Sequence, residues 1–186
     1  MRVWRNEAEY DLGPCVAALG MFDGVHIGHQ ALIRRAQALA QELGAACIVH
    51  TFDRHPLSLL RPERAPRQLL SLEDKLEKFE KMGVDGVLVQ PFTAEFAATD
   101  PRGFLEGLAQ NLQLKGVVAG FNYSFGAGGC GNAEMLRNEA HELGYECLII
   151  DPVTEAGETV SSTLIRRLIE NGERERAERL LGVQAR

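Results

Sequence analysis

The stretch Gly20-Met-Phe-Asp-Gly-Val-His-Ile-Gly-His29 lies between a short apolar run and a long amphipathic segment. Residues 15–19 have the composition of a buried strand, and residues 30–43 carry apolar side chains at helical spacing. The glycines therefore fall on a turn that leads from a strand into a helix. At such a turn the backbone can approach a polyphosphate closely, and the free N–H groups at the helix start attract anions.

Two histidines occupy this turn. His26 stands at the turn itself, and His29 stands three residues later in the first turn of the helix. Residues three apart on a helix share a face, so both imidazoles can face the same phosphate groups. The tetrad His-Ile-Gly-His resembles the HxGH signature of the nucleotidyltransferase superfamily, and it occurs in the strand, turn and helix context expected for that signature.

Apolar runs and helical patterns alternate along the rest of the chain. This alternation predicts an α/β, Rossmann-like nucleotidyltransferase fold with a five-stranded, mostly parallel sheet and helices on both faces. Ligands in such folds gather at the carboxyl ends of the strands. We expect strands at residues 15–19, 46–52, 86–90, 116–120 and 145–150, a loop or short hairpin at 152–159, and helices at 30–43, 71–82, 100–112, 132–143, 162–170 and 173–181.

Length and composition indicate a single domain over residues 1–186, with the loop and helices of residues 152–186 packed on it. A net charge of −6 argues against a nucleic-acid partner, which requires a basic face. The N-terminal segment has scattered charges, and no apolar run approaches the roughly 20 residues of a membrane helix. We therefore expect a cytoplasmic protein without a nucleic-acid or membrane partner. The pattern leaves the oligomeric state open.

The four cysteines show neither CxxC pairing nor metal-ligand spacing with histidine, so the sequence predicts no direct metal site. Three of them, Cys15, Cys47 and Cys147, lie in or beside apolar runs and are expected to pack as small buried hydrophobes. Only Cys130 falls in an expected loop.

Four further segments extend the resemblance along the chain. Residues 20–30 are similar in wording to the adenylyltransferase module of prokaryotic FAD synthetase, the usually bifunctional riboflavin kinase/FMN adenylyltransferase. The other segments are similar to that family's TF-x-x-HP segment, helix start, flavin-side loop and ISSTxIR motif: Thr51-Phe-Asp-Arg-His-Pro56, Leu70-Ser-Leu-Glu-Asp-Lys75, Gly120-Phe-Asn-Tyr-Ser-Phe-Gly126 and Val160-Ser-Ser-Thr-Leu-Ile-Arg166.

The resemblance implies transfer of AMP from ATP to FMN, giving FAD and pyrophosphate, with Mg²⁺ bound through the phosphates. It implies three catalytic residues, His26, His29 and Arg166. ATP-binding residues are expected at Gly20, Met21, Phe22, Asp23, Gly28, Ser161, Ser162 and Thr163. Flavin-binding residues are expected at Phe52, His55, Pro56, Asn122 and Phe125.

The residues themselves leave some of these roles open. Ser161, Ser162 and Thr163 stand where a helix begins, so ordinary N-capping explains them as well as phosphate binding does. The planar guanidinium of Arg166 suits phosphate oxygens. The aromatic residues fit core packing and a flavin slot about equally. Asp23 either orients a histidine or contacts the nucleotide.

Two departures from the family pattern stand out. Cys130 takes a place where relatives usually carry Lys or Arg, so anion binding is expected to be weaker there. The chain ends at Arg186, where bifunctional relatives continue into a riboflavin kinase module. If the chain is whole, that domain is absent and the chain does not phosphorylate riboflavin.

Two other functions compete with this interpretation. One is a non-catalytic flavin- or nucleotide-binding regulator with the same fold, which the intact histidines and Arg166 disfavour. The other is a related nucleotidyltransferase acting on another phosphorylated small molecule, such as a pantetheine phosphate, nicotinate mononucleotide or a polyol phosphate. The amino-acid sequences of residues 22–26 and of residues 122–126 disfavour this second alternative.

Overall fold

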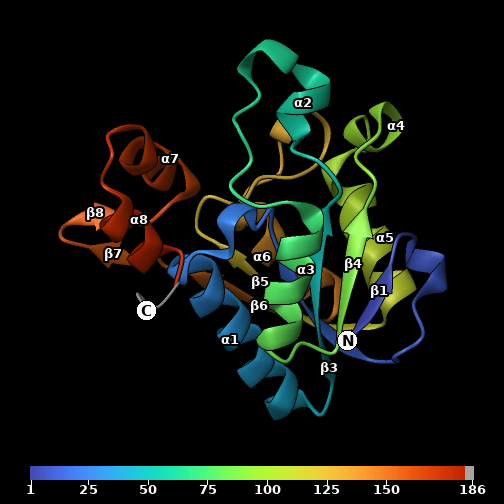
Figure 1. The fold of residues 1–186 in the computed structure, drawn as a ribbon. Helices are drawn as coiled ribbons and strands as arrows, with labels where there is room; N and C mark the ends of the chain where they lie inside the picture. The colour runs from blue at the N-terminus through green and yellow to red at the C-terminus, as the bar shows by residue number, and fades with distance from the viewer. Residues whose placement is uncertain (183–186) are drawn as a thin grey trace.

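The computed structural model describes residues 1–182, and its centre is a parallel β-sheet (Figure 1). Six strands pair in the order β1-β4-β3-β2-β5-β6, and every neighbouring pair is parallel. The central strands are short apolar runs buried on both faces, as a parallel sheet between helices requires. The strands are β1 (Arg2–Trp4), β2 (Cys15–Leu19), β3 (Ala46–Phe52), β4 (Gly86–Gln90), β5 (Leu114–Gly120) and β6 (Glu146–Ile150).

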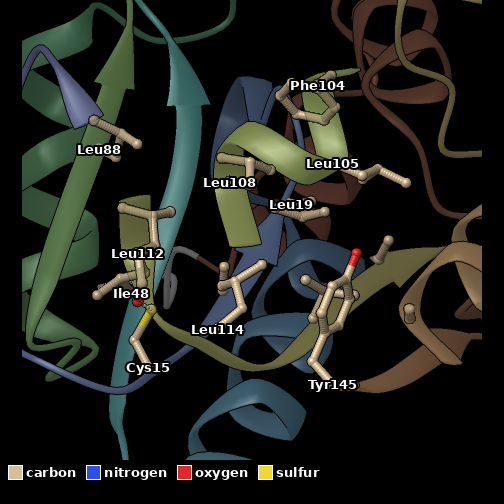
Figure 2. Packing of buried hydrophobic residues seen from close by; sticks show 14 of the residues in the cluster. Cys15, Leu19, Ile48, Leu88, Phe104, Leu105, Leu108, Leu112, Leu114 and Tyr145 are labelled. Atoms are coloured by element: carbon tan, nitrogen blue, oxygen red, sulfur yellow. Dashed lines mark hydrogen bonds between the residues drawn. The ribbon is translucent and has the colours of Figure 1, made fainter. Parts of the chain in front are cut away.

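Long helices cover both faces of the sheet. On one face lie α1 (Ile27–Leu43) and α3 (Leu72–Lys81), and on the other lie α5 (Pro101–Leu112) and α6 (Ala133–Leu143). Alternate residues of β2 point to opposite faces and so join different core clusters. Figure 2 shows the cluster under α5, which includes Cys15, Leu19, Ile48, Leu105, Leu108 and Leu112.

Side-chain caps fix where the main helices begin. Each capping side chain accepts a hydrogen bond from the backbone N–H three residues later. The expected starts near residues 71, 100 and 132 are confirmed. The first helix begins at Ile27 rather than at residue 30, because a histidine provides its cap. The capping residues are His26, Ser71, Asp100, Asn132 and Ser161.

The C-terminal segment forms a small cluster of its own beside the start of α1 (Figure 1). The expected hairpin is present as β7 (Thr154–Glu155) and β8 (Glu158–Thr159), followed by α7 (Ser162–Glu170) and α8 (Arg174–Leu180). Ile27 and Leu69 pack against the buried residues of these helices, so the cluster is joined to the loop that begins α1.

The sheet has six strands where five were expected. The missed strand, β1, has only three residues, two of them exposed, so it leaves no apolar run in the sequence. Its buried Trp4 lies over Gly86 of β4, where a Cβ atom would come within 2.3 Å of the indole. The expectation also missed short helices: α2 (Pro56–Leu60), α4 (Ala94–Ala97), and 3₁₀ turns η1 (Glu7–Glu9), η2 (Asp23–Val25), η3 (Pro62–Arg64) and η4 (Ala127–Gly129).

The strand order creates a crevice at one edge of the sheet. The chain proceeds from β2 to β3 and β4 on one side, and it later adds β5 and β6 on the other side of β2. Ligands of open parallel sheets bind outside the carboxyl ends of the strands at such a switch point. The loops after β2 and β5 therefore lie where a ligand is expected. No helix within residues 1–182 has the length and apolar character needed to cross a membrane.

Candidate active site

The loop between β2 and α1 turns through a left-handed backbone. Phe22, Gly24 and Val25 have φ angles of 51°, 83° and 43°. Positive φ is uncommon for a bulky residue and a genuine outlier for a β-branched one, so the surroundings must hold this loop in place. Such backbone strain concentrates at functional sites.

Side chains from outside this loop, most of them far away in sequence, hold its carbonyl groups. Four of its carbonyl oxygens accept hydrogen bonds from side chains outside the loop, at distances of 2.9 to 3.2 Å. The donors are Lys75 and Thr51 to Met21, Ser162 to Asp23, Lys78 to Gly24, and Gln30 to Val25. The carbonyls are thereby fixed, and the first N–H groups of α1 lack intrahelical partners, as at any helix start.

His26 and His29 stack on each other at the start of α1. Their ring centroids are 3.6 Å apart and their planes meet at 18°. The Nδ1 atom of His26 accepts a hydrogen bond from the backbone N–H of His29 at 3.3 Å. A Cβ atom at Gly28 would lie 3.2 Å from the His26 ring, so glycine at this place gives the ring its space.

Both imidazoles are neutral near pH 7. Burial lowers the pKa of His26 to about 4, although the Asp23 carboxylate opposes this effect. Burial, the adjacent His26 and the charge of Lys75 hold the pKa of His29 well below its ordinary value. Because Nδ1 of His26 accepts a hydrogen bond, its proton resides on Nε2, which makes that atom a neutral donor. Nδ1 of His29 is buried without a partner among residues 1–182.

Asp23 joins this loop to the C-terminal helices. Its carboxylate pairs with the guanidinium of Arg166 and accepts the backbone N–H of Leu69 at 2.9 Å. Arg166 also donates to the carbonyl of Arg67 at 2.7 Å. The sequence left two roles open for Asp23, and in this structure it holds an arginine rather than a histidine.

A cavity of about 280 Å³, called the polar cavity for its many histidine, hydroxyl and charged side chains, is lined by residues from both ends of the chain. His26, His29 and Arg166 all line it, together with His55 and Asn122. It is lined by the loop between β2 and α1, by residues 150–153 at the end of β6 and by the start of α7. Six of the expected ATP-binding residues also line it: Met21, Asp23, Gly28, Ser161, Ser162 and Thr163.

Two of the expected ATP-binding residues do not line this cavity. The Phe22 ring is fully buried, with its centroid 5.2 Å from that of His29 and 5.7 Å from that of Phe79. A Cβ atom at Gly20 would lie 3.1 Å from the Phe22 ring, so Gly20 makes room for that ring. Phe22 therefore packs against His29 from the core side, and Gly20 leaves the space that the Phe22 ring needs.

A second cavity, of about 290 Å³, is apolar. Phe52, Pro56 and Phe125 line it, whereas the other two expected flavin-binding residues, His55 and Asn122, line the polar cavity. The cavities adjoin where β3 leads into α2, because His55 faces one and Pro56 the other. Further aromatic residues of the apolar cavity are Phe92, Phe96, Phe104 and Tyr123. Cys130 is exposed and follows Gly129 on its rim.

Sequence reasoning missed the lysines beneath the site. Lys75 is buried, and its Nζ atom donates to oxygens of Met21, Thr51 and Phe52. A signal for this position exists in the sequence. Residues 72, 75, 76 and 79 share one helix face, and the other three are Leu, Leu and Phe, so Lys75 lies on an apolar face.

Comparison with known proteins identifies the family. The family model described as FAD synthetase matches residues 8–164. This chain belongs to the FAD synthetase family. The bifunctional riboflavin kinase/FMN adenylyltransferase of Listeria monocytogenes is 44% identical over 168 residues, which are 90% of this chain and 53% of the relative. The Bacillus subtilis protein of the same name is 35% identical over the same shares of the two chains.

The chain spans about half the length of the curated relatives it matches. Its fold has a solved counterpart in a crystal structure described as a macrolide-efflux protein from Streptococcus pneumoniae. The two superpose with a TM-score of 0.86 at 31% identity, over 97% of this chain and 59% of that one. This coverage takes in both the parallel sheet and the C-terminal helices.

Proposed function

We propose that this chain transfers AMP from ATP to FMN, giving FAD and pyrophosphate. The observation that carries the proposal is the pair of adjoining cavities, one polar and built on the N-termini of α1 and α7, the other apolar and aromatic. Helix N-termini suit a triphosphate, and an apolar slot suits a flavin ring. The names of the related FMN adenylyltransferases support the same reaction.

The reaction balances as a simple displacement. A phosphate oxygen of FMN attacks the α-phosphorus of ATP and forms a new P–O bond. The bond from that phosphorus to the oxygen bridging to the β-phosphate breaks, and pyrophosphate leaves with the electron pair. The attacking phosphate is already anionic, so a general base is hardly needed. Positioning and charge stabilisation carry the rate.

Different residues of the polar cavity bind different phosphates of ATP in this proposal. His26 and His29, neutral and stacked, donate hydrogen bonds to the α-phosphate or the bridging oxygen. The backbone N–H of Ser162 at the start of α7, together with Thr163 and Arg166, binds the β- and γ-phosphates that leave. Arg166 is oriented in advance by Asp23 and by the Arg67 carbonyl, which reduces the ordering that ATP binding requires.

Magnesium accompanies ATP in this proposal. Among the residues that the structure describes, no three His, Cys, Asp or Glu side chains lie together in a group that could hold a metal. The Asp23 carboxylate is engaged by Arg166 and Leu69. A Mg²⁺ ion that arrives with ATP would be held by the phosphate oxygens and would neutralise part of their negative charge.

The proposal includes the partners and the cellular setting. ATP and FMN are small-molecule partners, and a net charge of −6 disfavours a nucleic acid. All four cysteines are free, which suits a reducing compartment such as the cytoplasm.

Incubation of the protein with ATP, FMN and Mg²⁺, followed by chromatography, tests the proposal. We expect FAD and pyrophosphate in equal amounts. Riboflavin in place of FMN should give no product. Absence of FAD at saturating substrates would overturn the proposal, as would better AMP transfer to nicotinate mononucleotide or a pantetheine phosphate.

A further inference from the structure

Lys75 of α3 is an ammonium group that is buried and bonded only to neutral oxygens among residues 1–182. Only 6% of the residue is exposed, and Nζ donates to the Met21 carbonyl at 3.1 Å, the Thr51 hydroxyl at 3.2 Å and the Phe52 carbonyl at 3.4 Å. No ion pair of Lys75 occurs within residues 1–182. Burying an unpaired charge is costly, so such a group is retained where its charge has a use.

The three oxygens place Lys75 behind the junction of the two cavities. Met21 lines the polar cavity, and Phe52 lines the apolar cavity. The Thr51 hydroxyl also donates to the Met21 carbonyl at 3.0 Å, so β3 and the loop before α1 are joined at this point. One ammonium group thereby fixes the backbone on both sides of the place where the two substrates of the proposed reaction would meet.

The charges around Lys75 leave it as a source of positive potential. The carboxylates that act on it are Asp23, which is paired with Arg166, and Asp53, which is paired with Arg54 at 3.3 Å. The nearby His29 and His55 both have pKa values lowered by burial and by the charge of Lys75 itself. The two stacked histidines are neutral, so they can donate hydrogen bonds to the phosphates but do not neutralise the phosphates' negative charge.

We propose that Lys75 is a positioning residue for nucleotidyl transfer, which holds the Met21 and Phe52 backbone at the cavity junction and supplies positive charge beneath the reacting phosphates. This inference rests on the proposed function. The ammonium must remain protonated for both tasks. Burial lowers the pKa of Lys75 to about 8, although Asp23 and Asp53 oppose this. Binding of anionic phosphates then raises that pKa.

Activity of matched variants tests the role. Lys75→Met keeps the length of the side chain but removes its charge and its hydrogen bonds. We expect kcat to fall by roughly 10²-fold, as for a displaced reacting group. In the unchanged protein, kcat/KM should decline above about pH 8. Lys75→Met should lose that high-pH limb. Lys81→Met, on the same helix at an exposed position, should match the unchanged protein.

Wild-type kcat and an intact high-pH limb in Lys75→Met would overturn the proposal. A direct titration covers the case in which this variant fails to fold. The chain has only four lysines, at 75, 78, 81 and 115, so NMR of ¹³C-labelled lysine side chains can follow each one. Lys75→Arg assigns the signal. We expect Lys75 to titrate near pH 8 and its pKa to rise when ATP binds. A Lys75 with an ordinary pKa that does not change with ATP would contradict the inference.

The two measurements also separate this inference from the proposed function. The titration with ATP needs no turnover, so it reports on Lys75 even if the unchanged protein makes no FAD. Conversely, FAD formation together with an ordinary Lys75 titration would leave the proposed reaction standing and remove the lysine from it.

Discussion

At the scale of single residues, the stacked histidines show how burial defines a role. Burial keeps His26 and His29 neutral near pH 7, so they can direct N–H groups but cannot neutralise charge. The positive charge near the polar cavity comes instead from Arg166 and from the lysines of α3. The histidines therefore supply oriented hydrogen-bond donors, and Arg166 and the lysines supply the positive charge.

Replacing His29 by alanine tests the first of these functions. The backbone N–H that His26 accepts from is kept, so we expect a folded protein with FAD formation reduced by about 10²-fold or more. Steady-state kinetics with FMN and ATP, together with thermal melting, measure the two effects. His141→Ala, at an exposed position on α6, is the matched control. Unchanged turnover in His29→Ala would remove this histidine from the mechanism.

The sequence predicted which side chains reach the polar cavity better than it predicted their partners. The spacing of His26 and His29 is local, and a helix turn fixes it. The Asp23–Arg166 pair joins residues 143 positions apart, and Lys75 contacts residues 54 and 24 positions away. Such pairs arise from tertiary packing, and no local pattern encodes them.

At the scale of elements, the start of α7 combines a structural and a functional role. Ser161 caps the helix by accepting the N–H of Leu164 at 3.1 Å, and it also lines the polar cavity. Ser71 caps α3 through the same bond length to Asp74 but does not line that cavity. These two serines therefore separate capping from phosphate binding.

The variants Ser161→Ala and Ser71→Ala should each lower the free energy of unfolding by about 1 kcal/mol, because each removes an N-cap. Only Ser161→Ala should also raise the KM for ATP. Urea denaturation and ATP titration of the initial rate measure the two effects. If both variants bind ATP as the unchanged protein does, Ser161 acts as a cap alone.

Element boundaries could be predicted where the chain carries a cap or an apolar run. Ser71, Asp100 and Asn132 marked three helix starts, since their side chains satisfy backbone N–H groups locally. Strand β1 has 3 residues, α2 has 5 and α4 has 4, so each is too short to show a periodic pattern. The conformation of β1 depends on its pairing with β4, which lies far away in sequence.

At the scale of the whole molecule, alternation of strands and helices predicted a parallel sheet but not its order. The order depends on which strands pair, and β1 pairs with β4 across more than eighty residues. The crevice follows from that order, because β2 and β5 are neighbours although two strands separate them in sequence. The sequence therefore predicted that the site residues gather at the carboxyl edge of the sheet, and the structure brings most of them to one cavity there, but the sequence did not show how the two cavities adjoin.

A buried histidine links the stability of the whole molecule to pH. His50 of β3 is fully buried between Phe52 and Phe104, and neither of its ring nitrogens has a partner among residues 1–182. Burial lowers its pKa to about 4. Between pH 6.5 and 4 the unfolded chain binds a proton that the folded chain excludes, so stability falls as pH falls. His26 acts in the same direction.

His50→Leu should stabilise the protein and weaken this pH dependence. It removes two buried nitrogens that lack hydrogen-bond partners, and we expect this to raise the free energy of unfolding by about 1 kcal/mol at neutral pH. It also removes a slope of up to about 1.4 kcal/mol per pH unit between pH 6.5 and 4. Urea denaturation at pH 7.5, 6 and 5 measures both, with exposed His141→Gln keeping the original slope. An unchanged slope in His50→Leu would mean that acid sensitivity comes from His26 and the carboxylates, and that burial of His50 has no thermodynamic consequence.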